Sequence, residues 1–104
     1  MKRIILDENL PHPLRSELGE YEVFTVQYQG WSGIKNGELL KRIEGSFDVF
    51  LTADKNLRYQ QNLAGRRVAI IELPFTRLKS LLPLLPQIRA TINSTIEGGY
   101  YQVS

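Results

Sequence analysis

MKRIILDENL, at residues 1–10, is the segment that best indicates the fold of the whole chain. Residues 4–6 are three consecutive aliphatic side chains, which fits a strand covered on both faces better than a half-exposed one. The apolar run ends at two adjacent carboxylates, Asp7 and Glu8. Ligands bind at the carboxyl ends of central strands in open α/β sheets. The two acids therefore either lead into the next helix or hold a cation.

Length and composition favour one small domain over residues 1–104. The hydrophobic fraction of 42% can supply one core, and the mean hydropathy of −0.23 is typical of a soluble chain. A net charge of +2 permits a nucleic-acid partner without requiring one. The absence of cysteine excludes disulfides and thiolate metal sites. Because the sequence has no secretory apolar region and no run of membrane-spanning length, we expect a cytoplasmic protein without a membrane partner.

Strand and helix patterns alternate along the chain. Strands are expected at residues 4–6, 21–26, 47–52 and 68–73, with a short edge strand at 98–104. Helices are expected at 9–19, at 36–43 with Asn36 as N-cap, from 57 to about Ala64, and at 77–94. Pro83 and Pro86 should kink or break the last helix. The alternation predicts an α/β fold with a mainly parallel sheet of four to five strands and helices on both faces.

The order of the strands in the sheet decides which acids meet. Crossover handedness and short connections favour neighbouring positions for the first and third strands, with the second strand outside the first. The third strand is followed by Thr-Ala-Asp, which ends at Asp54. This arrangement places Asp7 and Asp54 at neighbouring carboxyl ends.

A cluster of acids is the strongest candidate for chemistry. Asp7, Glu8 and Asp54 should converge on one crevice, with Glu38 entering from the start of the second helix. Carboxylates this close repel one another unless they are protonated or bridged by a cation. Magnesium and manganese suit such oxygen-rich sites, where the bound metal can activate water and polarise a phosphate.

Basic and aromatic residues downstream of Asp54 could bind RNA. The cations that could contact a phosphate backbone are Lys55, Arg58, Arg66 and Arg67. Tyr59 and Trp31 could stack on bases. At this net charge the four cations are more often a solvated face than a binding stripe, and Trp31 is more typical of a packing anchor for its loop.

Structural interpretations of the acids stay open beside the functional ones. Asp7 and Asp54 both precede helices, and an N-cap aspartate contributes about 1 kcal/mol without any further role. Glu8 can be a first-turn acid that the helix dipole favours, and Glu38 can be a surface residue at a helix start. The shared edge of Asp7 and Asp54 is the feature that favours a site.

Several motifs together resemble a known family. IILDENLP at 4–11, GIKNGELL at 33–40, FDVFLTADKNL at 47–57 and YQQNL at 59–63 are similar to the small bacterial PIN-like proteins, shortened relatives of the PIN-domain nucleases and VapC-type toxins. The resemblance implies a three-layer α/β/α fold and a Mg²⁺- or Mn²⁺-dependent endoribonuclease, the toxin of a toxin–antitoxin pair. The partners it implies are an RNA substrate and a cognate antitoxin protein, and a homodimer is compatible with it.

The resemblance also assigns site residues. Asp7 matches the acid after the first strand, Asp54 the acid after the strand ending in Thr-Ala-Asp, and Glu8 the second acid of the Asp-Glu-Asn signature. These three are the expected metal ligands. Many relatives carry an aspartate at the start of the second helix, where this chain has the neutral Asn36, and Glu38 could compensate as a fourth catalytic acid. The alternative is a catalytically degenerate PIN-like module that binds RNA or a protein partner.

A phosphoryl-accepting receiver domain is a third hypothesis. Receivers also use acids after the first strand and an aspartate after the third, as Asp7, Glu8 and Asp54 are placed here. The fourth strand, however, ends in Glu72 and Leu73 without the expected hydroxyl. No later strand supplies the matching lysine, so this hypothesis ranks below the other two.

Overall fold

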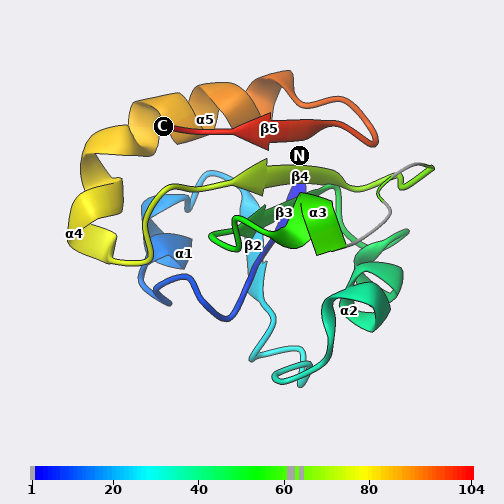
Figure 1. The fold of residues 1–104 in the computed structure, drawn as a ribbon. Coiled ribbons are helices and arrows are strands. Elements are labelled where there is room, and N and C mark those ends of the chain that lie inside the picture. The colour runs from blue at the N-terminus through cyan, green and yellow to red at the C-terminus, as the bar shows by residue number, and fades with distance from the viewer. Residues whose placement is uncertain (1, 61–62, 64) are drawn as a thin grey trace.

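The computed structural model describes residues 2–60, 63 and 65–104, and within them five strands form one parallel sheet. The strands are β1 (Arg3–Leu6), β2 (Glu22–Thr25), β3 (Val49–Thr52), β4 (Ala69–Glu72) and β5 (Tyr100–Gln102). Their order across the sheet is β2-β1-β3-β4-β5, and every neighbouring pair is parallel (Figure 1). The predicted contact between the first and third strands is confirmed, as is the edge strand near the C-terminus.

The helices follow the expected alternation but are mostly shorter than expected. They are α1 (Leu14–Glu17), α2 (Asn36–Ile43), α3 (Leu57–Gln60), α4 (Leu78–Leu81), a 3₁₀ turn η1 (Leu82–Leu84) and α5 (Leu85–Ser94). Pro13 is the N-cap of α1, so the helix expected from residue 9 starts only after the second proline. The break expected at Pro83 and Pro86 is confirmed by η1. The predicted end of α3 near Ala64 lies outside the described residues.

Two apolar clusters cover the two faces of the sheet. Side chains alternate between the faces along each strand, so Ile4 and Leu6 face one cluster and Ile5 faces the other. The first cluster joins the sheet to α1, α4 and α5, and the second joins it to α2 and α3. This compact arrangement is consistent with a three-layer α/β/α sandwich.

The strand register determines what meets where the strands end, which we call the carboxyl edge. Leu6 pairs with Leu51, and Thr52 pairs with Glu72. The residue after Leu6, Asp7, is therefore level with Thr52 and Glu72. All three continue the face that carries Ile5. No helix in the described part of the chain is long and apolar enough to cross a membrane.

Candidate functional site

Asp7 is a buried carboxylate at the end of β1. Its backbone N–H donates to the carbonyl of Leu51 (2.9 Å), which extends the β1–β3 ladder by one residue and fixes the direction of the side chain. Only 7% of the residue is exposed. Oδ1 accepts the backbone N–H of Glu8 (2.8 Å), and Oδ2 accepts the hydroxyl of Thr52 (2.7 Å). Both carboxylate oxygens are therefore held by neutral donors.

The environment of Asp7 disfavours its charged form. Burial is the main cause that raises its pKa above the ordinary 3.8, and the charges of Glu8 and Asp54 raise it further. The hydrogen bonds from Thr52 and the Glu8 backbone act in the opposite direction and are outweighed. No cationic side chain among the described residues contributes to this shift. The negative charge of Asp7 is solvated by dipoles but is not neutralised.

Thr52 connects the two aspartates, a role that sequence reasoning missed. Its side chain is fully buried, and its Oγ1 donates to Asp7 and accepts the backbone N–H of Asp54 (3.0 Å). One hydroxyl thus orients the Asp7 carboxylate and the backbone at Asp54. The available signal was a threonine at the end of an apolar strand, two residues before an acid.

One carboxylate oxygen of Asp54 stabilises a turn, and the other faces the side chain of Asn36. Its Oδ1 accepts the backbone N–H of Asn56 (2.9 Å), a turn that leads into α3, so the structural interpretation is partly right here. Its Oδ2 accepts the side-chain amide of Asn36 (3.1 Å). For Asp7 the helix-capping interpretation is wrong, because α1 begins at Leu14 and Asp7 makes no capping bond.

Asn36 and Glu38 occupy opposite sides of α2. The expectation that Asn36 caps the helix is wrong: Lys35 is the N-cap, and Asn36 is the first helical residue. Asn36 turns its amide to Asp54. Glu38 lies two residues later, about 200° around the helix, and pairs with Arg42 (3.3 Å) on the solvent face. The structure therefore brings Asn36, and not Glu38, to the acids.

Glu8 is exposed and lies at the margin of the acids. Its Oε1 accepts the backbone N–H of Gly33 (3.2 Å), and its carbonyl accepts the side-chain amide of Gln27 (3.4 Å). Glu8 thus ties the segment after β1 to the loop before α2. Its carboxylate keeps one oxygen without a described hydrogen-bond partner.

The four predicted RNA-binding cations do not form one stripe. Lys55 and Arg58 follow β3 and lie toward the carboxyl edge, whereas Arg66 and Arg67 precede β4 and lie at the opposite, amino edge. Arg66 pairs there with Glu44 (3.2 Å), which ends α2. The two pairs of cations therefore lie at opposite edges of the sheet, and their contact with RNA stays a prediction.

A cavity of about 850 Å³ also lies at the amino edge, away from the acids. Its lining includes Lys2, Arg3 and Arg67. Lys2 donates to the carbonyl of Ile92 (2.7 Å) at the end of α5, and Arg3 pairs with Glu22 (3.4 Å). Because two of these three cations are engaged in structural contacts, size alone does not make this cavity the functional site.

Glu72 is a second buried acid at the carboxyl edge, and sequence reasoning assigned it no role. It is 7% exposed, and its two oxygens accept the hydroxyl of Tyr100 (2.6 Å) and the side-chain amide of Gln102 (3.3 Å). Burial first, and then the bond to Glu72, raises the pKa of Tyr100 well above its ordinary value. The Tyr100 hydroxyl therefore remains a proton donor across the physiological range.

The aromatic residues differ in their surroundings. Trp31 packs edge-on against Phe47, with ring centroids 6.3 Å apart, so its interpretation as a packing anchor is confirmed. Tyr59 is 73% exposed and belongs to α3, next to Arg58.

The donor set at Asp7 and Asp54 fits a hard divalent cation. Two carboxylates can bind Mg²⁺ when waters and substrate oxygens complete the shell, and rotation of the Asn36 amide would add a carbonyl oxygen. A cation would also offset both the burial of the Asp7 charge, the main cause of its raised pKa, and its repulsion by Glu8 and Asp54. Across residues 2–60, 63 and 65–104, no group of three or more acidic, histidine or cysteine side chains is arranged to hold a metal. The fit is thus to a two-carboxylate site.

No protein family, curated protein or solved structure matches this chain.

Proposed function

We propose that this chain is a PIN-like, Mg²⁺- or Mn²⁺-dependent endoribonuclease that acts as the toxin of a toxin–antitoxin pair in the cytoplasm. The observation that carries the proposal is the charge balance of the carboxyl edge. Four carboxylates end the strands there or follow them, at Asp7, Glu8, Asp54 and Glu72. They accept hydrogen bonds from neutral donors, and none of them has an ion-pair partner among the described residues.

Uncompensated buried acids are costly for a fold, because burial penalises a charge that no partner neutralises. A divalent cation and the phosphates it recruits would supply the missing positive charge. The toxin role and the antitoxin partner rest on the sequence resemblance of residues 4–57 and 59–63.

Each residue of the site has a distinct proposed task. Asp7 and Asp54 would hold the cation, which supplies an activated water and polarises the scissile phosphate. Thr52 fixes the Asp7 carboxylate by its hydroxyl and keeps Asp54 in register. Lys55 and Arg58 are the cations nearest in sequence to Asp54 and would contact the RNA backbone.

An RNA cleavage assay tests this proposal. The purified chain should cleave RNA with Mg²⁺ or Mn²⁺ and lose the activity in chelator. Asp7→Asn keeps the shape of the side chain and should abolish cleavage, whereas Glu38→Gln, on the solvent face of α2, should leave it unchanged. RNA cleavage that persists both in the Asp7→Asn variant and in chelator would contradict the proposal.

A catalytically degenerate PIN-like module, which binds RNA or a protein partner without cleaving, is the second candidate. The neutral Asn36 favours it, since its amide donates to Asp54 where relatives place a carboxylate. RNA binding without cleavage at any Mg²⁺ or Mn²⁺ concentration would support this candidate over the first.

A further inference from the structure

Tyr59 is a large aromatic side chain that the fold leaves in solvent. It is 73% exposed, although α3 is anchored through the fully buried Leu57. Single exposed aromatics are ordinary on protein surfaces, so exposure alone indicates nothing. What distinguishes Tyr59 is that its ring is held in place.

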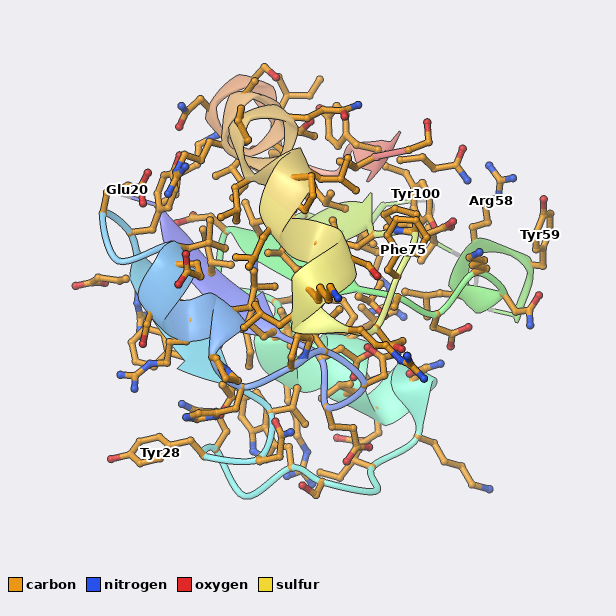
Figure 2. The ribbon with its side chains drawn as sticks, turned by 90° about the vertical axis from the view of Figure 1, so that its left-hand side faces the viewer. Glu20, Tyr28, Arg58, Tyr59, Phe75 and Tyr100 are labelled. Carbon is orange, nitrogen blue, oxygen red and sulfur yellow. The ribbon has the colours of Figure 1, made fainter. Side chains whose placement is uncertain are left out.

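Arg58 holds the ring of Tyr59 from one side. The guanidinium carbon lies 4.8 Å from the Tyr59 ring centroid, and Nη2 donates to the Tyr59 hydroxyl (2.6 Å). The same guanidinium carbon lies 5.9 Å from the Tyr100 ring centroid. Figure 2 shows Arg58 between Tyr100 and Tyr59. The three side chains form an aromatic–cation–aromatic set.

The inner member of this set is anchored in the sheet. Tyr100 belongs to the edge strand β5, and its hydroxyl donates to the buried Glu72 of β4 (2.6 Å). Glu72 pairs with Thr52 at the end of the β3–β4 ladder, so the set is tied to the edge of the sheet that carries Asp54. Glu72 and Tyr100 thus connect Arg58 to the sheet.

We propose that Tyr59, backed by Arg58, is a stacking subsite for one nucleobase of the RNA substrate. The base would stack on the ring face of Tyr59 opposite Arg58, and the adjoining phosphate would meet the positive charge of Arg58 and Lys55. Aromatic faces beside cations are how proteins bind unpaired bases without reading their sequence. This inference rests on the proposed function, because that function supplies the nucleic acid.

Binding of an oligouridylate of about ten nucleotides tests the subsite. The parent is the full chain with Asp7→Asn in chelator, so that cleavage is absent. Tyr59→Ala should weaken binding by about tenfold, within the range for loss of one stacked base. Tyr59→Trp should retain the affinity. Circular dichroism shows that each variant is folded.

Two matched controls separate stacking from other effects. Tyr28 is 83% exposed and projects apart from the Arg58–Tyr59 pair, so Tyr28→Ala should leave affinity unchanged (Figure 2). An abasic ribose-phosphate oligomer of the same length should bind the parent and its Tyr59→Ala variant equally. The subsite is overturned if the parent does not bind oligouridylate, if Tyr59→Ala has no effect, or if the abasic probe shows the same loss.

The outcomes also separate this inference from the proposed function. Binding that depends on Tyr59 in a chain that never cleaves RNA supports the subsite and contradicts the nuclease. Metal-dependent cleavage with no effect of Tyr59→Ala on binding supports the nuclease and contradicts the subsite.

Discussion

The two edges of the sheet treat charge in opposite ways. At the amino edge, Arg66 pairs with Glu44, and Lys2 binds the carbonyl end of α5. At the carboxyl edge, the Asp7 carboxylate accepts a hydroxyl and a backbone N–H, and the Asp54 carboxylate accepts an amide and a backbone N–H. The Arg66–Glu44 pair balances charge at one edge, whereas the carboxylates of Asp7 and Asp54 have no ion-pair partner among the described residues.

The difference lies in how each edge affects the stability of the fold. The Arg66–Glu44 ion pair at the amino edge links two chain segments, and each charge has its partner within the fold. A buried aspartate without a cation weakens the folded state when ionised, because its raised pKa reflects an environment that favours the neutral form. Acids without an ion-pair partner at one edge of the sheet are what we expect of a site that binds a cation and a phosphate.

Apart from the two aspartates themselves, the largest effect should come from Thr52, which hydrogen-bonds to both of them. Thr52→Val keeps the shape but removes the donor to Asp7 and the acceptor for the Asp54 backbone. Cleavage should fall by about 10- to 100-fold, as for other groups that orient metal ligands. Thr52→Ser should retain most of the activity in the same assay. Equal activity for the valine variant would mean that the hydroxyl does not organise the site.

Asn36→Asp should increase the negative charge of the carboxyl edge and so the difference between the two edges. The variant places a third negative charge next to Asp54, so it should tighten Mn²⁺ binding by about tenfold, because ligand charge tunes cation affinity. Without metal, the added repulsion should lower the thermal midpoint. Calorimetric titration measures the first effect and a thermal melt the second. An unchanged affinity for Mn²⁺ would mean that residue 36 does not contact the cation.

Arg66→Met tests the amino edge. Loss of the pair with Glu44, whose side chains are 20% and 19% exposed, should lower the unfolding free energy by about 1 kcal/mol. Urea denaturation measures this, with Glu38→Gln as a control that breaks a more exposed pair. RNA cleavage should be unaffected. Weaker RNA binding by a fully stable Arg66→Met would extend the RNA site to the amino edge.

The smallest effect concerns pH and Asp7. Since its pKa is raised in the fold, the folded state binds more protons than the unfolded chain above pH 3.8, and stability falls as pH rises through that window. Asp7→Asn removes this dependence, so its thermal midpoint relative to the parent should rise between acid and neutral pH. A difference between the two proteins that does not vary with pH would contradict the uncompensated charge.

Hydrophobic patterning predicted most of the fold because it acts over whole elements. The apolar runs at β1 and β3 and the apolar face of α2 located these elements, and short right-handed connections gave the order β2-β1-β3. The same rules brought Asp7 and Asp54 to one edge. The start of α1 was missed because two prolines outweighed the leucine spacing.

The details of the site depended on contacts that a pattern does not contain. Thr52 meets Asp7 across 45 positions of sequence. Glu38 and Asn36 differ by two positions, so the rotation of the helix by about 200° decided which one faced Asp54. Arg66 lies at the amino edge because it precedes β4, and the spacing of the basic residues in the sequence does not indicate this position.

Calorimetric titration with Mn²⁺ at neutral pH decides whether the carboxyl edge holds a cation. We expect saturable binding by the parent chain, its loss in Asp7→Asn and in Asp54→Asn, and its retention in Asp48→Asn, whose carboxylate accepts the Arg3 backbone N–H at the amino edge. Absence of saturable binding, or binding that survives both substitutions at the carboxyl edge, would contradict it.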